Sequence, residues 1–149
     1  MHQVSFRQAT ADDIPGLATI RAVSWGSETY WITRITGYLA GTVNPQKALE
    51  PRIIYVALVE DQIAGFIGGH LTQRFDCDGE LEWIDVLEPY RRLGIASRLI
   101  TKLFQWFIER GAFHICVDPG NDIARQFYKK NGAEMLNQHW MHWPNINHS

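Results

Sequence analysis

The chain has little of the chemistry that marks several large protein classes. Its 149 residues include two cysteines, Cys77 and Cys116, and no second ligand pair stands at zinc spacing from them. The longest apolar run, Ile53–Val59, is too short to cross a bilayer. The sequence also has no G-x-G-x-x-G motif. These absences argue against a zinc module, a membrane-spanning protein and a dinucleotide-binding oxidoreductase, and we expect no metal.

Charge of either sign is also not in large excess. Fourteen basic and sixteen acidic residues give a net charge of −2, so no clustered basic excess supports a nucleic-acid partner. The length fits one domain, residues 1–149, without repeats or linkers. Because Met1 to Phe6 contain no apolar signal region, we expect a cytoplasmic protein without membrane contact.

Hydrophobic periodicity predicts alternating helices and strands. The predicted helices cover about 14–23, 28–39, 94–110 and 122–130, with a short helical turn starting at Asn44-Pro45 and ended by Pro51. The predicted strands cover 4–9, 53–59, 62–71, 81–87, 113–117 and one final strand, 134–143. Glu60-Asp61 is the predicted turn of a hairpin.

The segment Arg91-Arg92-Leu93-Gly94-Ile95-Ala96-Ser97 connects the predicted strand 81–87 to the amphipathic helix 94–110. A helix start leaves backbone N–H groups free and carries partial positive charge, so this loop could bind a pyrophosphate. Gly94 would allow close approach of the backbone, and Arg91 and Arg92 add charge. Alone, this pattern also fits an ordinary strand-to-helix connection with solvated arginines.

The flanking segments make the pattern more specific. Apolar residues change phase near Trp83-Ile84, which predicts a β-bulge before Asp85. After the strand 113–117, Asn121 is placed as the N-cap of a helix that ends at Asn131-Gly132.

The order strand, R-x-x-G-x-A, helix, strand and N-x-x-A-x-x-x-Y-x-x-x-G resembles the GNAT superfamily of N-acetyltransferases, which use acetyl-coenzyme A. The matching residues are Val86, Arg91, Gly94, Ala96, Asn121, Ala124, Tyr128 and Gly132. Ala96 replaces a glycine that is frequent in the family. The resemblance implies an α+β, three-layer fold: a mixed, mostly antiparallel sheet of about six to seven strands, splayed in the middle and flanked by about four helices.

The resemblance also implies roles for individual residues. The cofactor would contact the strand edge at Val86 and Leu87 and the loop Arg91–Ser97. A backbone N–H near Val86 or Leu87 would stabilise the oxyanion, and Asn121 would either cap its helix or bind the cofactor arm. Tyr128 would protonate the departing thiolate. Glu80, Glu82 and Asp85 are candidate bases, and Glu80 matches the position where several family members carry a catalytic glutamate; a water chain would be the alternative.

The aromatic residues Trp25, Tyr30, Trp31 and Tyr38 fall in the segment that, by resemblance, covers the acceptor, and the first three are candidate acceptor contacts. Rings beside carboxylates suit a cationic amine, although such rings also pack helices on sheets. We therefore expect an acetyl-CoA-dependent N-acetyltransferase acting on a small-molecule or peptide amine, with a homodimer as one assembly. The alternatives are an acyltransferase with a longer acyl-CoA or another acceptor, and a non-catalytic acyl-CoA sensor.

Overall fold

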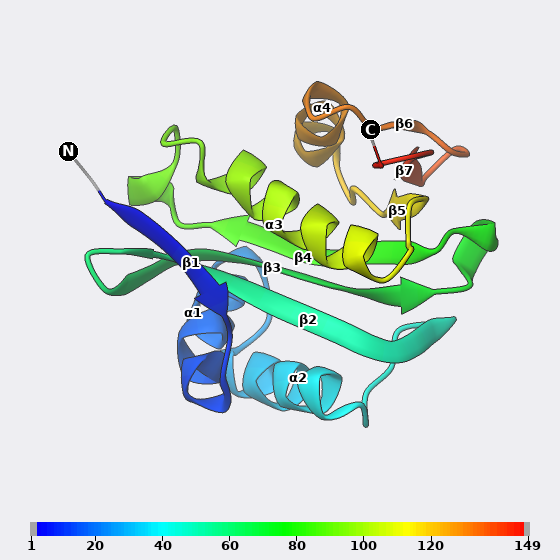
Figure 1. Cartoon of the computed structure of the whole chain (residues 1–149). Helices are drawn as coiled ribbons and strands as arrows, with labels where there is room; N and C mark the ends of the chain where they lie inside the picture. The colour runs from blue at the N-terminus through cyan, green and yellow to red at the C-terminus, as the bar shows by residue number, and fades with distance from the viewer. Residues whose placement is uncertain (1–2, 148–149) are drawn as a thin grey trace.

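Seven strands form one mixed sheet in the computed structural model, which describes residues 3–147 (Figure 1). The spatial order is β1-β2-β3-β4-β5-β7-β6, and β4 and β5 form the parallel pair among antiparallel neighbours. The strands are β1 Val4–Gln8, β2 Ala48–Val59, β3 Gln62–Thr72, β4 Gly79–Val86, β5 Ile115–Val117, β6 Glu134–Met135 and β7 Met141–Trp143.

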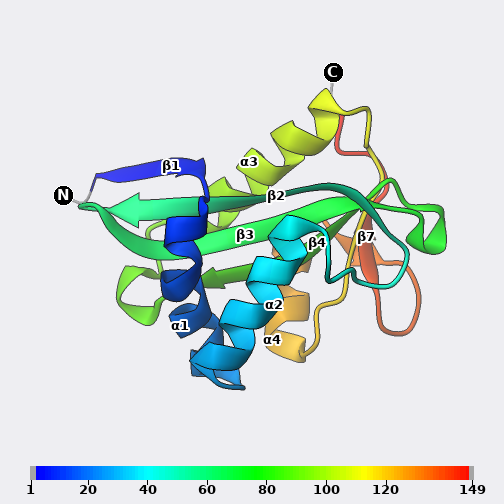
Figure 2. The same cartoon turned by 90° about the horizontal axis from the view of Figure 1, so that it is seen from below.

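Four α-helices complete a three-layer α+β fold, as predicted. They are α1 Ile14–Ser24, α2 Glu28–Ala40, α3 Ile95–Glu109 and α4 Asp122–Lys130, with short 3₁₀ turns η1 Ala11–Asp13, η2 Arg74–Asp76 and η3 Glu88–Tyr90. Helices α1 and α2 cover one face of the sheet, whereas α3 and α4 lie on the other (Figures 1 and 2). Within residues 3–147, no helix has both the length and the apolar character that crossing a membrane requires.

Each face of the sheet has its own apolar core, because each helix layer buries one apolar stripe. Between the sheet and α3, the buried residues include Leu99, Leu103 and Phe107, which follow the spacing expected from the sequence. Between the sheet and α1 and α2, Leu17, Trp31, Tyr38 and Trp83 are among those that pack together. The functional groups described below lie mainly beside this second core.

Two local predictions were wrong. No helix follows Asn44-Pro45; instead β2 begins at Ala48 and continues through Pro51, with an irregularity in register between Ala48 and Arg52. An irregular position tolerates proline because one ladder hydrogen bond is already absent there. The Arg52 guanidinium donates to the carbonyls of Tyr38 and Val43, which fixes the chain that leaves α2.

The predicted final strand 134–143 is instead a hairpin of β6 and β7. The Asn137 side chain accepts hydrogen bonds from the N–H groups of His139 and Trp140, and Leu136 N–H donates to the carbonyl of Trp140. An asparagine side chain that binds the backbone two residues later favours a turn over a continuous strand. In contrast, the Glu60-Asp61 hairpin was predicted correctly, and both residues have positive φ angles.

Candidate active site

The central strands β4 and β5 separate after a short contact. They pair at Gly79–Leu81 with Ile115–Val117, and β5 then ends. β4 continues along β3 to Val86, so its other edge from Glu82 onward has no strand partner in residues 3–147. The predicted splay of the central strands is therefore present, and it leaves a row of backbone groups open to a ligand.

Backbone direction decides which N–H group faces this seam. Leu87 N–H donates to Ala64 O at 2.8 Å, so it is bound to the β3 side. Successive N–H groups of a strand point to opposite sides, so the N–H of Val86 points toward the seam. Of the two residues expected to supply an oxyanion donor, the geometry therefore favours Val86 over Leu87.

A β-bulge in β4 carries one of the predicted carboxylates. Gly68 pairs with Trp83 and Gly69 pairs with Leu81, which leaves Glu82 as the extra residue. The bulge lies one residue before the predicted change of phase at Trp83-Ile84. A bulge turns its residue out of the regular alternation of side chains. Glu82 is accordingly half-buried, whereas its neighbours Leu81 and Trp83 are buried.

The loop at the start of α3 has the backbone of an anion site. Arg92 and Gly94 both have left-handed conformations, with φ of 70° and 75°. The first backbone bond of the helix runs from Arg98 N–H to Gly94 O, and the N–H groups of residues 92–97 donate to no other described residue. Alternating left-handed residues direct successive N–H groups to one side, as in phosphate-binding nests.

The side chains of this loop support that arrangement. A Cβ at Gly94 would meet no atom within 4 Å, so the space above it is open. Arg91 donates from Nε to Val86 O at 2.9 Å, which ties the loop to the end of β4. Leu93 is exposed, whereas Ile95 is buried under the helix. A ligand at the loop would therefore contact Arg92, Leu93, Ala96 and Ser97. The loop itself is held to β4 by Arg91.

Glu80 and Glu82 lie together on the α2 side of β4. Glu80 is buried and accepts a hydrogen bond from Arg74 Nε at 3.0 Å. Burial and the neighbouring Glu80 carboxylate raise the pKa of Glu82 to about 7, although Arg34 and Arg74 oppose this shift. Glu82 makes no ion pair with a described residue, and with this pKa it can exchange a proton at neutral pH.

Asp85 has a different environment from the other two carboxylates. Arg21 of α1 donates to it at 2.9 Å, and both side chains are largely buried. Burial raises the pKa of Asp85, although Arg21 opposes that shift. Asp85 is therefore held to α1 by an ion pair, whereas Glu82 is not.

Tyr128 of α4 lies on the far side of the seam from α1. Its ring packs edge-on against Trp143, and its hydroxyl has no hydrogen-bond partner among the described residues. Burial, and secondly the charge of Asp85, raise the pKa of the phenol above its ordinary value. Tyr128 therefore stays protonated at neutral pH, as a general acid must.

Asn121 takes the capping role in this structure. Its Oδ1 accepts from Ala124 N–H at 2.8 Å at the start of α4. The Nδ2 group remains a potential donor, so both roles considered for Asn121 are compatible.

The three aromatic candidates do not share one role. Trp31 is buried and donates from Nε1 to Trp25 O, and its ring stacks on Arg21 and contacts Trp83. Trp25 and Tyr30 are 58% and 43% exposed, and each ring contacts Trp31. Trp31 is therefore a core residue, whereas Trp25 and Tyr30 can contact an acceptor.

Three residues of the site were not found from the sequence: Arg21, His70 and Arg74. Tyr38 was expected near the acceptor, but its partner His70 was not. Tyr38 Oη and His70 Nδ1 are 2.9 Å apart, and both side chains are buried. Arg21 contacts a carboxylate 64 residues away. No local pattern marks such pairs, because each partner belongs to a different element.

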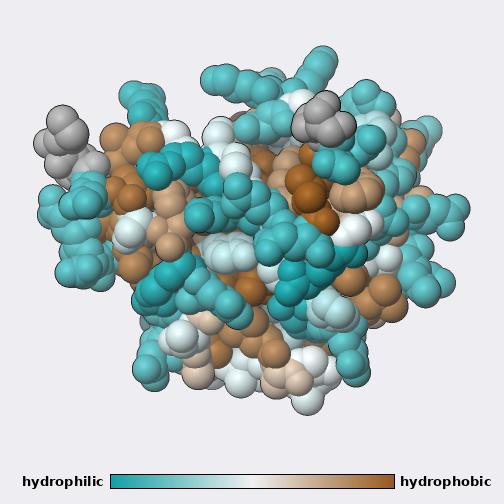
Figure 3. Space-filling view, viewed as in Figure 1, coloured by the Kyte–Doolittle hydropathy of each residue, from teal (hydrophilic) through white to brown (hydrophobic). Residues whose placement is uncertain are grey.

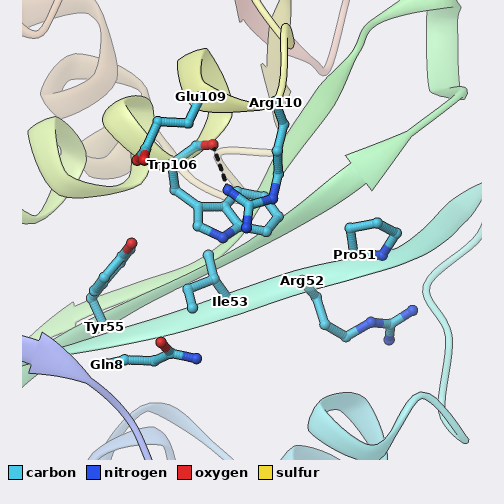
Figure 4. A pocket seen from close by; sticks show the side chains of 8 residues that line it. All are labelled: Gln8, Pro51, Arg52, Ile53, Tyr55, Trp106, Glu109 and Arg110. Atoms are coloured by element: carbon cyan, nitrogen blue, oxygen red, sulfur yellow. Dashed lines mark hydrogen bonds between the residues drawn. The ribbon is translucent and has the colours of Figure 1, made fainter.

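A surface hollow lies away from the seam. It lies between β2 and the C-terminal end of α3, and Tyr55, Trp106, Glu109 and Arg110 are among its lining residues (Figure 4). The Arg110 guanidinium bonds to Trp106 O there. This end of α3 is opposite to Gly94, so the hollow is separate from the seam.

The open seam thus lies beside a helix N-terminus whose backbone N–H groups can bind an anion. The chain belongs to the acetyltransferase (GNAT) family, whose model matches residues 17–133. No curated protein sequence matches the chain.

Solved structures agree with the fold. A GNAT-family acetyltransferase from Desulfovibrio desulfuricans is 14% identical and has a TM-score of 0.76. The match covers 95% of this chain and 99% of that chain. The PaiA N-acetyltransferase from Thermoplasma acidophilum, in complex with coenzyme A, is 14% identical, with a TM-score of 0.71 and the same coverage. The aminoglycoside N-acetyltransferase AAC(6')-Iy, in complex with CoA, is 20% identical, with a TM-score of 0.76, 93% of this chain and 92% of that chain covered.

Proposed function

We propose that this protein transfers an acetyl group from acetyl-CoA directly to a primary amine of a small molecule or peptide, in a ternary complex. The observation that carries the proposal is the seam itself: an unpaired β4 edge, with the Arg91–Ser97 loop at its end and Tyr128 across it. A pantetheine arm has two amides, so it can add to a free strand edge like another strand. Its pyrophosphate would then reach the N–H groups of the loop.

The residues of the seam suit the four requirements of acetyl transfer. The loop and strand edge hold the thioester, and Val86 N–H can bind the developing oxyanion. Glu82 accepts the proton of the amine, directly or through water, because it has no ion-pair partner among the described residues and its pKa is about 7. Tyr128 donates a proton to the departing thiolate. Glu80 and Asp85, each held by an arginine, keep their neighbours in place.

The acceptor is expected to be a cationic amine. Glu82 and the exposed rings of Trp25 and Tyr30 lie on the α1 and α2 side of the sheet, where they can attract an ammonium group. AAC(6')-Iy, which has the same fold, is an aminoglycoside N-acetyltransferase, and this likeness supports an amine acceptor. Because two of the three carboxylates already have arginine partners, the attraction should depend mainly on Glu82.

The test is a panel of amines, followed by release of free thiol from acetyl-CoA. Small cationic amines and peptide N-termini should react, whereas alcohols and anionic amines should not. A longer acyl-CoA tested in parallel separates this proposal from the related acyltransferase. Tight CoA binding without turnover on any acceptor would instead support an acyl-CoA sensor.

We also propose a cytoplasmic location, with a homodimer as one assembly. On the face shown in Figure 3, polar side chains separate several apolar areas rather than surround one broad patch. A broad apolar patch is the usual mark of a stable interface. Sedimentation of the purified protein would decide the assembly.

A further inference from the structure

Three side chains on the α2 side of β3 and β4 bring potential metal ligands together. Each of these side chains, His70, Glu80 and Glu82, offers one ligand atom, and the three atoms lie within 4.8 Å of one another. His70 and Glu80 face each other across the β3–β4 ladder, and the bulge adds Glu82 from the same side. Imidazole and carboxylate are the ligand types that catalytic zinc sites combine.

A buried nitrogen in this cluster lacks a partner. His70 is fully buried, and its Nε2 makes no hydrogen bond in the described structure. The atom faces Glu80 Oε1 at 3.6 Å, which is too long for a good hydrogen bond. Buried polar atoms without partners are rare and costly, so this nitrogen indicates a ligand between the two side chains.

Two of the three side chains, His70 and Glu80, also have a hydrogen-bond partner that orients them. Tyr38 Oη lies 2.9 Å from His70 Nδ1 and can accept a hydrogen bond from Nδ1–H, and in that tautomer the Nε2 lone pair is free. Arg74 donates to Glu80 Oε1 and is itself stacked over Trp140. Hydrogen bonds of this kind orient the ligands of metal sites. The Arg74 charge opposes a cation, so the affinity should be moderate rather than that of a structural zinc site.

A second group of metal-binding side chains fits an ion less well. His114 Nε2 contacts His142 Nδ1 at 2.8 Å and Cys77 Sγ at 3.5 Å. Each of these three atoms already has a partner. The ligand atoms of this second group also do not all approach within the 4.8 Å reached by the first group, among the residues that the structure describes.

We propose that His70, Glu80 and Glu82 form a binding site for a divalent transition-metal ion, with Zn²⁺ as the ion that its ligands fit best. Three protein ligands leave a coordination position open, as in exchangeable zinc sites. Mg²⁺ and Ca²⁺ prefer oxygen ligands alone and should bind weakly. Since the ion would occupy the carboxylate proposed as base, it would inhibit acetyl transfer; this consequence alone rests on the proposed function.

The binding test uses the full-length protein after dialysis against a chelator. Zn²⁺ titrated by calorimetry should bind at one ion per chain, and Mg²⁺ should give no comparable heat. His70→Gln and Glu82→Gln should each weaken Zn²⁺ binding by about tenfold or more, since even residues behind the ligands cost 10–100-fold. Co²⁺, whose visible absorption reports its coordination, should lose that spectrum in the same variants.

His142→Gln is the matched control, because it removes a histidine from the second group and leaves the proposed ligands unchanged. Zn²⁺ binding that survives in H142Q and fails in H70Q supports the site. Absent binding, or binding lost in H142Q and kept in both H70Q and E82Q, would overturn it. If H70Q does not fold by circular dichroism, the half-buried Glu82→Gln decides the question.

Inhibition is measured separately, by mass spectrometry of the acetylated amine, because free coenzyme A thiol also binds Zn²⁺. Zn²⁺ should slow the reaction reversibly, and excess chelator should restore it. A protein that acetylates no amine would refute the proposed function, while the calorimetry would still decide the metal site. An active enzyme that Zn²⁺ neither binds nor inhibits would refute this inference alone.

Discussion

The two sides of the seam are built by different means. On the α3 and α4 side, the groups expected to hold the cofactor are mostly backbone atoms in one short segment, residues 92–97, and one capping side chain. On the α1 and α2 side, the groups are charged side chains paired over long distances, such as Arg21 with Asp85. Backbone sites depend on local conformation, whereas side-chain sites depend on how the layers pack.

The largest effect is expected for Gly94→Glu. The new carboxylate would repel the pyrophosphate and block two or more charge-assisted hydrogen bonds of about 1.5–3 kcal/mol each, so CoA affinity should fall on the order of 10²–10⁴-fold. Gly111→Glu is the matched control: Gly111 also has a left-handed φ, 70°, and open space around it, at the other end of α3. Calorimetry with CoA should separate the two. Equal affinities in G94E and G111E would show that the loop is not the pyrophosphate site.

Tyr128→Phe tests the group that faces the seam from α4. Loss of a general acid should lower kcat by roughly 10²–10³-fold and change the Michaelis constant for acetyl-CoA little, because the proton moves only in the transition state. Phenylalanine keeps the edge-on packing with Trp143. Steady-state kinetics with the best acceptor is the measurement, and unchanged turnover would return Tyr128 to a packing role.

The long-range pair on the α1 side can be tested through stability. Arg21→Met leaves Asp85 buried without its partner, which should cost about 2–4 kcal/mol in unfolding free energy. The double variant Arg21→Met with Asp85→Asn should recover part of that loss, since no unpaired charge remains. Urea unfolding of the unmodified protein, the two single variants and the double variant gives the coupling energy. A coupling near zero would mean that packing, not the ion pair, joins α1 to β4.

A pH profile tests the base. The pKa of Glu82 is raised to about 7, and a base works only when deprotonated. In chelator-treated protein, kcat should therefore be highest above pH 7 and fall about tenfold per unit below it. Glu80→Gln removes the nearest like charge and should move the midpoint to lower pH; Arg34 and Arg74 are unchanged in this variant. A midpoint that stays at the same pH in E80Q would assign the titration to another group.

The smallest effect separates the two roles of Asn121. Asn121→Ala should cost about 1 kcal/mol of stability through loss of the helix cap. Asn121→Asp keeps the capping oxygen and removes the amide donor. If N121D retains stability and loses CoA affinity, the side chain also binds the cofactor; if it retains both, Asn121 only caps α4.

Much of the cofactor side could be predicted because its signals are local. The Gly94 turn, the apolar stripe of α3 and the Asn121 cap each depend on residues within a few positions of one another. The change of phase in β4 located the bulge to within one residue. The hairpin at β6 and β7 was missed, because an alternating pattern fits one long strand and two short strands alike.

The sequence by itself determined the family, the three-layer fold and the turn at Gly94 that begins α3, because backbone conformation follows from nearby residue types. Tertiary structure alone decided the charge state of the site. It paired Asp85 with Arg21 and Glu80 with Arg74, and it left Glu82 without an ion-pair partner among the described residues. It also brought His70 against Tyr38 and Glu80. Burial and electrostatic interaction depend on distance in space. The elements α1, α2, β3 and β4 must therefore pack together before these side chains can meet.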